Sequence, residues 1–248
     1  MKVLVLYVFH ELQDRVRAFL KHAVFEAPDV DFVLVCNNKS LNVEVPSYVK
    51  ILYRDNIGFD FGGWSYALLT KDLYKEYTHF VFANSSVIGP FLKKKERWTD
   101  IFLARLTESV RLVGPTINTC SGYKDPKQFA HVQSYFFVMA LNTLEFLIQK
   151  EIFSLSNLAL TFQDAIWEKE VRMSRVLVNN QWNIGCLLDW YHGLDFTFQT
   201  SCDTRVLLDD IMYHEYRNVF WNEYNLVFIK GNRVPLDYQT ILQSTSDA

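Results

Sequence analysis

A run near the amino terminus, Lys2–Phe9, most constrains the fold because it is almost continuously apolar. A strand with one face in water alternates apolar and polar residues, whereas a strand covered on both faces reads as an apolar run. Residues 16–24 carry apolar side chains at helical spacing, and Asp31–Cys36 and Val49–Tyr53 are further apolar runs. This strand–helix–strand order predicts an α/β domain, with a mostly parallel sheet sandwiched by helices and right-handed crossovers.

The composition fits a single domain over residues 1–248. Half of the residues are hydrophobic and 16% are aromatic, which suffices for a buried core and argues against disorder. The net charge of -3 gives no basic surface, so nucleic acid is not expected as a partner. No apolar run has the length of a membrane span, and the amino terminus lacks the features of a signal peptide. We therefore expect a soluble, cytoplasmic protein.

The cysteines point to no metal or disulfide framework. Cys36, Cys120, Cys186 and Cys202 are scattered, without a Cys-x-x-Cys pair or a zinc-type Cys/His spacing. Isolated thiols in a reducing compartment are the expectation. The chain also lacks a Gly-x-Ser-x-Gly elbow, a Walker loop and a spaced dinucleotide fingerprint.

Later elements follow from weaker signals. Asn142 and Glu145 have the spacing of a capping box and predict a helix start. The other predicted elements are a helix at Trp98–Leu106, strands at Val110–Thr116, His131–Met139 and Val227–Ile229, and a surface loop at Asn118–Gln128.

Two polar turns follow predicted strands. The stretch Tyr53–Trp64 closes one strand and opens a helix through a glycine-studded turn, and a second strand, His79–Ala83, ends in a turn of Asn84, Ser85 and Ser86. Ligands of open α/β sheets bind outside the carboxyl ends of the strands. Glycines let the backbone approach a bulky anion, and a helix amino terminus attracts a diphosphate. The two turns together predict a nucleotide site.

The same turns carry a resemblance to a known family. Asn-x-Gly-x-Asp-Phe-Gly at residues 56–62 and Asn-Ser-Ser-x-x-Gly-Pro at residues 84–90 resemble the rhamnan synthesis protein F family and, more loosely, GT-A glycosyltransferases. The resemblance covers roughly residues 1–196. It implies a GT-A-like, Rossmann-like fold, in which residues 1–117 are the nucleotide-sugar half and residues 118–248 hold the acceptor half.

The resemblance implies transfer of a sugar, possibly rhamnose, from a UDP- or dTDP-linked donor to a glycan or glycoprotein acceptor. The residues it implies for the nucleotide-sugar are His10, Asn56, Gly58, Asp60, Asn84, Ser85 and Ser86. The residues it implies for the acceptor are His131, Gln133 and His192, with His214 as a further candidate. Each histidine also admits a purely structural role as a hydrogen-bonded group.

Glu170 is the candidate catalytic residue. On a helical wheel for residues 164–180, Glu170 falls within the apolar arc, whereas Glu168 and Lys169 fall on the charged side. A carboxylate that faces a core is costly unless it is paired or lines a cavity, and it can then have a raised pKa and act as a base. The resemblance favours a general base for inverting transfer. The alternative is a structural Glu170, hydrogen-bonded to backbone or to a buried Arg or Tyr.

The sequence has no acidic metal motif where GT-A enzymes carry Asp-x-Asp. Asn84, Ser85 and Ser86 supply oxygens without charge, whereas magnesium and manganese prefer anionic ligands. We therefore expect that a divalent metal is not required and that protein cations neutralise the diphosphate. The candidate cations are Arg54, Lys93, Lys94 and Lys230. Asp60 is the remaining acid at this edge, and it could instead, or in addition, cap the helix that begins near Gly62.

Two rival functions remain open at this point. A non-catalytic module that binds nucleotide-sugar or glycan for a partner enzyme would fit the uncharged turn. A nucleotidyltransferase would need metal carboxylates, which Asn84–Ser86 fits poorly. Retaining transfer is also open, because stereochemistry depends on geometry.

Overall fold

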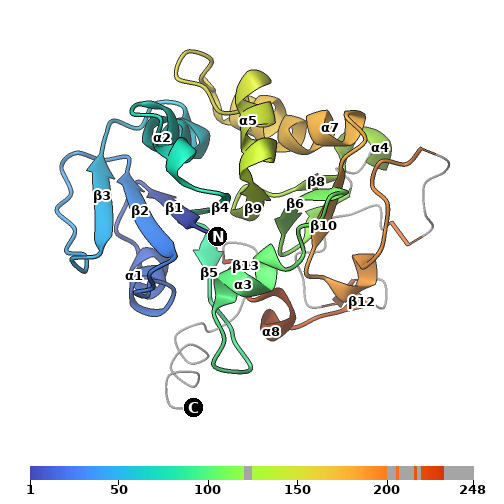
Figure 1. The fold of residues 1–248 in the computed structure, drawn as a ribbon, viewed down its shortest axis with the longest axis horizontal. Helices are drawn as coiled ribbons and strands as arrows, with labels where there is room; N and C mark the ends of the chain where they lie inside the picture. Colours follow the sequence, from blue (N-terminus) through green and yellow to red (C-terminus); the bar gives the residue numbers. More distant parts are fainter. Residues whose placement is uncertain (120–124, 200–204, 207–214, 217–218, 232–248) are drawn as a thin grey trace.

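The computed structural model describes residues 1–119, 125–199, 205–206, 215–216 and 219–231 (Figure 1). One seven-stranded sheet runs through the molecule, and only its strand β9 is antiparallel to its neighbours. The prediction of an α/β domain with a mostly parallel sheet is therefore confirmed. In order across the sheet, the strands are β10 (Asn183–Cys186), β6 (Val110–Gly114), β9 (Phe136–Ala140), β4 (His79–Asn84), β1 (Val3–Phe9), β2 (Val30–Cys36) and β3 (Val49–Tyr53).

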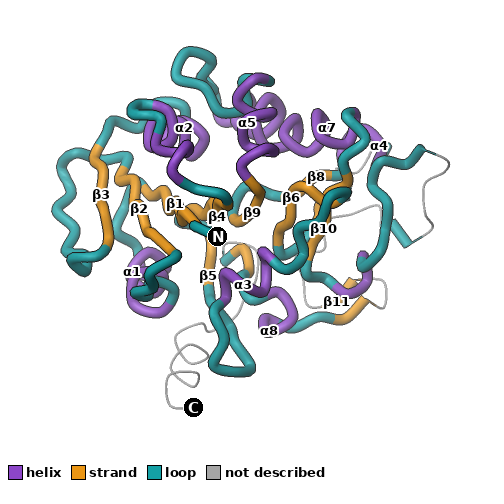
Figure 2. The backbone as a smooth tube through the Cα atoms, viewed as in Figure 1, coloured by secondary structure: helices purple, strands orange, loops and turns teal. Residues whose placement is uncertain are grey.

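Helices cover both faces of the sheet (Figure 2). On one face lie α2 (Phe59–Leu69), α5 (Leu141–Gln149) and α7 (Arg172–Asn179), and on the other lie α1 (Asp14–His22), α3 (Trp98–Leu103) and α8 (Glu223–Leu226). The remaining helical segments of the described residues are η1 (Leu73–Glu76), α4 (Pro126–Phe129), α6 (Phe162–Asp164), η2 (Ala165–Val171) and η3 (Asp189–Tyr191). Three two-stranded ladders complete the described part: β5 (Val87–Ile88) with β13 (Ile229–Lys230), β7 (Ile117–Asn118) with β8 (His131–Val132), and β11 (Glu215–Tyr216) with β12 (Val219–Phe220).

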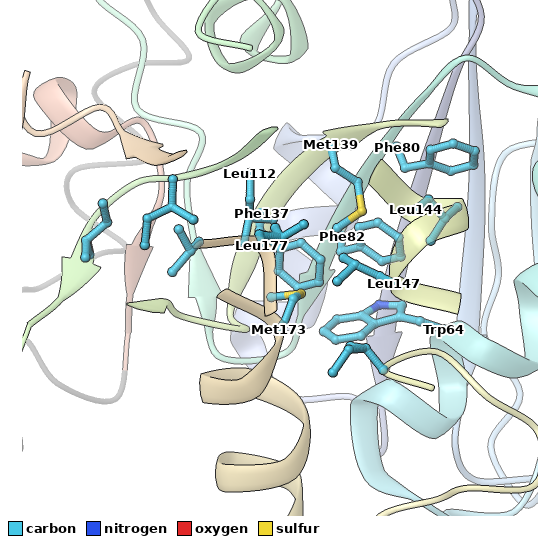
Figure 3. Packing of buried hydrophobic residues seen from close by; sticks show 14 of the residues in the cluster. Trp64, Phe80, Phe82, Leu112, Phe137, Met139, Leu144, Leu147, Met173 and Leu177 are labelled. Atoms are coloured by element: carbon cyan, nitrogen blue, oxygen red, sulfur yellow. The ribbon is translucent and has the colours of Figure 1, made fainter. Parts of the chain in front are cut away.

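The core has two halves, one on each face of the sheet. Every residue of β1 is buried, as its continuous apolar run predicts, because its side chains point alternately into the two halves. The half beneath α2, α5 and α7 is rich in aromatic and sulfur-containing side chains (Figure 3). There the Trp64 ring stands edge-on to Phe82 and Phe137, and these two stack on each other with centroids 4.7 Å apart. This packing fixes α2 against the sheet and so positions the turn that precedes it.

Several predicted boundaries need correction. The single strand predicted at His131–Met139 is two strands, β8 and β9, separated by a turn at residues 133–135. Asn142 is not a cap, because β9 leads straight into α5 and Ala140 is the residue that precedes the helix. The helix predicted at Trp98–Leu106 ends at Leu103. The predicted strand at Val227–Ile229 is shifted to β13, because α8 runs up to Leu226.

The helix predicted over residues 164–180 begins earlier and is not uniform. A capping box between Thr161 and Asp164 starts it at Phe162, and residues 165–171 form a π-helical segment, η2. Hydrogen bonds in a π-helix reach one residue further than in an α-helix, so the chain turns less per residue than the wheel assumes. The placement of Lys169 on the solvent face is therefore wrong: Lys169 is only 3% exposed, and Glu170 is buried beside it.

None of the helices in the described part of the chain has the length and apolar character needed to cross a bilayer. Cys36 and Cys186 are free thiols, in agreement with the prediction, while Cys120 and Cys202 lie outside the described residues.

Candidate functional site

A cleft of about 390 Å³ opens beside the carboxyl ends of β1 and β4. This is the edge of an α/β sheet where ligands are expected. Residues from both halves of the chain line it: His10, Asn37, Asn56, Phe59, Asp60, Phe61, Asn84, Ser85, Ser86, Asn118, Phe129, His131, Gln133, Ser134, Tyr135, Phe162, Ala165, Ile166, Glu170 and Lys230.

Asn84 makes hydrogen bonds to several segments that line the cleft. Its amide nitrogen donates to Asp60 Oδ2 at 2.8 Å and to the carbonyl oxygen of Ser134 at 3.4 Å, and its own Oδ1 accepts from the backbone N–H of Ser86 at 2.9 Å. The two polar turns of the sequence therefore meet through a direct side-chain contact. Asp60 is not the helix cap, because Gly58 is the residue that precedes α2 and Asp60 lies within its first turn.

Asp60 has an unusual electrostatic environment. Burial raises its pKa, the hydrogen bond from Asn84 lowers it, Glu170 raises it and Lys230 lowers it, with a result of about 6. Desolvation disfavours the charged carboxylate, and a second carboxylate nearby adds to that effect. Asp60 therefore titrates close to neutral pH.

Glu170 is held by several groups at once. Its Oε2 accepts from the backbone N–H of Ser134 at 2.6 Å and from the Ser134 hydroxyl, and its Oε1 lies 3.5 Å from Nε2 of His131. Burial would raise the pKa of Glu170, but the hydrogen bond and charge of His131, the charge of Lys230 and the Ser134 hydroxyl lower it to about 2. The raised pKa that the sequence suggested for Glu170 is thus found at Asp60 instead.

The orientation of His131 defines which nitrogen meets Glu170. Nδ1 lies 2.7 Å from the carbonyl oxygen of Phe129, which can only accept, so Nδ1 carries a proton. Nε2 then faces the carboxylate, and a neutral imidazole would present a lone pair to it. A proton on Nε2 would remove that repulsion and let the ring donate toward the carboxylate.

The turn that leads into α2 is braced from inside. Arg54 donates through Nη1 to Asn37 Oδ1 at 2.9 Å and through Nη2 to the carbonyl oxygen of Ile57 at 2.7 Å. Asn37 in turn donates to Asn56 Oδ1 at 3.3 Å. Gly62 is needed here, because a Cβ would lie 2.1 Å from the Ile57 oxygen. Arg54 therefore supports the turn and does not line the cleft, contrary to its candidacy as a phosphate ligand.

Among the four candidate cations, Lys230 is the one that lines the cleft. It lies on β13, which pairs with β5, and the neighbouring Gly231 N–H donates to the Ser86 oxygen at 2.7 Å. Lys93 and Lys94 are exposed on the loop before α3 and do not line this cleft.

The remaining predicted site residues differ in whether they line the cleft. Nδ1 of His10 lies 2.8 Å from the carbonyl oxygen of Asn37 at the cleft wall. The carbonyl of Ser85 accepts from Arg15 Nε at 3.0 Å. Gly58 does not line the cleft; it is the residue before α2, with a left-handed φ of 75°. His192 is exposed at the end of η3 and does not line the cleft, and His214 lies outside the described residues.

A search against protein families matches residues 33–223 to the model of rhamnan synthesis protein F. The chain belongs to the rhamnan synthesis protein F family. Membership implies a role in the synthesis of rhamnan polysaccharide. No curated protein matches the chain. The matched span contains both polar turns, His131 and Glu170, whereas His10 and Lys230 lie outside it.

Sequence reasoning missed several cleft residues of this family member. Asn37, Phe129 and Phe162 belonged to no motif, and Phe59 occupies an unspecified position of the Asn-x-Gly-x-Asp-Phe-Gly turn. These residues reach the cleft through the strand order and the entry into α6. Gln133, by contrast, was predicted, and it has a feature that points to a ligand. It is 4% exposed, and its Oε1 has no hydrogen-bond partner. A buried polar atom without a partner is costly, and a bound hydroxyl would remove that cost.

Proposed function

We propose that this chain is a GT-A-type glycosyltransferase that moves rhamnose from a nucleotide-sugar to a glycan or glycoprotein acceptor. The observation that carries the proposal is the convergence of the hydrogen-bonded Asp60–Asn84 pair and the carboxylate of Glu170 on one cleft at the strand ends. Family membership supports rhamnose as the sugar. A fold of this class hosts many activities, so the site and the family together, and not the fold, support the assignment.

The donor occupies the part of the cleft formed by His10, Asn56 and the Asn84–Ser86 turn. The side-chain oxygens and backbone N–H groups there suit the pentose and the diphosphate of a UDP- or dTDP-linked sugar. Lys230 supplies the positive charge that the diphosphate needs, and its ammonium group is a common partner for phosphate. Because this turn lacks carboxylates, we propose that transfer does not require a divalent metal.

Glu170 acts as the general base, and His131 positions its carboxylate. As the acceptor oxygen attacks the anomeric carbon, the bond from that carbon to the phosphate oxygen breaks and the nucleoside diphosphate leaves with the electron pair. The proton of the acceptor hydroxyl passes to the carboxylate of Glu170, which the contacts to His131 and Ser134 hold in position. A single displacement of this kind inverts the anomeric configuration.

The direct experiment incubates the purified chain with UDP- or dTDP-rhamnose and a rhamnose-containing oligosaccharide. Nucleoside diphosphate release and the anomeric configuration of the product by NMR are the readouts. We expect release that depends on the acceptor, an inverted linkage, and unchanged rates in EDTA. Loss of activity in EDTA would contradict metal independence, and a retained configuration would contradict the single displacement.

A non-catalytic binding module is the second candidate, and the low pKa of Glu170 favours it, because a strongly acidic carboxyl is a weak base. Thermal shift separates the two. A ligand at about a hundred times its Kd stabilises a protein by about 2.7 kcal/mol, so a module would show the shift with the donor or the glycan but release no nucleotide with any acceptor.

A further inference from the structure

Phe59 and Phe162 are two of the aromatic side chains that line the cleft. They come from two segments far apart in the sequence, with ring centroids 6.3 Å apart and planes at 67°. Phe162 is 65% exposed, although it is a large aromatic side chain. The donor and base roles above leave both rings unassigned.

The backbone at Phe59 is strained in a way that places this ring. Its φ is 55°, in the left-handed region that bulky residues rarely adopt. Such a conformation costs about 1–2 kcal/mol. It follows directly on Gly58, which is also left-handed. Strained residues of this kind gather at ligand-binding sites, where the surrounding structure holds them.

Phe162 is also held in place. The capping box between Thr161 and Asp164 fixes it as the first residue of its helix. The loop before it is anchored by Lys169, whose Nζ donates to the carbonyl oxygens of Glu151 and Asn157 at 2.6 Å each. The exposed ring is therefore presented at the cleft mouth by a braced segment.

We propose that Phe59 and Phe162 form a stacking platform for a sugar ring of the acceptor glycan. The assignment to the acceptor rests on the proposed function. Phe162 and Glu170 belong to one continuous helical unit, and the eight residue steps between them span less than the roughly 12 Å of an α-helix, because residues 165–171 are π-helical. The platform thus contacts a sugar beyond the one whose hydroxyl reaches Glu170.

The chemistry of rhamnose suits such a pair of rings. A 6-deoxyhexose carries a methyl group and ring C–H bonds that make one side apolar, while its hydroxyls remain polar. Aromatic rings provide a flat apolar surface, and binding pockets combine such surfaces with a few polar groups. The unpartnered Oε1 of Gln133, in the same cleft, is available to accept from a hydroxyl.

The test compares Phe162→Ala, Phe162→Leu and Phe162→Tyr with the wild-type chain. Leu160→Ala is the matched control, because Leu160 is 87% exposed, lies two residues away and does not line the cleft. With a rhamnose oligosaccharide as the acceptor, we expect Phe162→Ala to raise the acceptor KM by about tenfold, the size of one aromatic contact. Phe162→Leu recovers little of the affinity, Phe162→Tyr recovers most of it, and the donor KM and Leu160→Ala stay near wild type.

Two results would contradict the proposed stacking platform. One is an acceptor KM within about twofold of wild type in Phe162→Ala. The other is a change in the donor KM alone, which would indicate that the rings contact the nucleobase of the donor. Binding of the same oligosaccharide, followed by saturation-transfer NMR without a donor, separates this inference from the proposed function. Glycan binding that depends on Phe162, in a chain without transferase activity, would support the stacking platform and contradict the proposed enzyme. Transfer that is insensitive to Phe162 would support the enzyme and contradict the platform.

Discussion

The side-chain amide of Asn84 donates a 2.8 Å hydrogen bond to the carboxylate of Asp60, which ties the end of β4 to the first turn of α2. Glu170 lines the same cleft. Their surroundings shift the pKa values of the two carboxyl groups in opposite directions: the pKa of Asp60 is raised to about 6 and that of Glu170 is lowered to about 2. Paired acids with separated pKa values are typical of sites that divide acid and base roles.

Asp60→Asn should stabilise the fold at neutral pH. Because burial raises the pKa of Asp60 above its unfolded value near 3.9, its contribution is fully present below about pH 4 and is lost as the pH rises to about 6. The difference corresponds to at most about 3 kcal/mol, and partial exposure reduces it. Denaturant unfolding from pH 4 to 8 should show a decline in the wild type that Asp60→Asn lacks.

The control for that measurement is Asp55→Asn, which changes an exposed carboxylate on the same turn. Equal pH dependence of wild type and Asp60→Asn would show that Asp60 does not titrate in this range.

Glu170→Gln should abolish most transfer without unfolding the chain. The amide keeps an oxygen that can accept from Ser134, but it takes no proton from an acceptor hydroxyl. General base catalysis contributes about 10²- to 10⁴-fold, so kcat should fall by about a hundredfold or more. Glu168→Gln, on the exposed side of the same helix, is the control and should retain activity. Turnover near wild type in Glu170→Gln would remove the assignment.

His131→Gln should move the acid limb of the pH–rate profile to higher pH. The hydrogen bond and charge of His131 lower the pKa of Glu170, so the carboxyl group of the variant takes up the inactivating proton at a higher pH than in the wild type. The pKa of Glu170 should thus rise above about 2. Profiles of kcat from pH 4 to 9 and carboxyl NMR titration measure the two effects. An unshifted acid limb would show that His131 does not stabilise the charged form of Glu170.

The sequence predicts best the elements whose signal is local. The third strand, Val49–Tyr53, is found at the predicted residues, and the first two strands are within one residue, because apolar runs bounded by polar residues define buried strands. The two polar turns were likewise expected at one edge of the sheet. The prediction needed only the rule that parallel strands end on the same side.

The features that the sequence did not predict depend on non-local geometry. The burial of Lys169 follows from a π-helical segment, which periodicity at the α-helical angle does not reveal. The antiparallel direction of β9 has no local signature, because it arises from the order of strands in the sheet. Lys230 could be proposed as one of four cations, but its place in the cleft depends on the pairing of β13 with β5.

Lys230→Met should weaken donor binding specifically. Hydrogen bonds to charged groups contribute about 1.5–3 kcal/mol, so the donor KM should rise by roughly ten- to a hundredfold while the acceptor KM stays the same. The dependence of the donor KM on salt should also become weaker, because one cation is lost. Lys94→Met removes an exposed lysine outside the cleft and is the matched control. Equal donor KM values in the two variants would exclude Lys230 as a phosphate ligand.

Lys169→Met should loosen the loop between α5 and α6. The ammonium of Lys169 is the donor for the Glu151 and Asn157 carbonyl oxygens, and burial lowers its pKa. A methionine fills a similar volume but leaves both oxygens without this donor, which costs about 1–3 kcal/mol each when the group stays buried. We expect faster amide exchange and faster proteolysis within residues 151–161, with a higher acceptor KM because Phe162 follows this loop. Lys150→Met, an exposed neighbour, should leave both rates unchanged. Protection of the loop at the wild-type level in Lys169→Met would show that other contacts hold Phe162 at the cleft mouth.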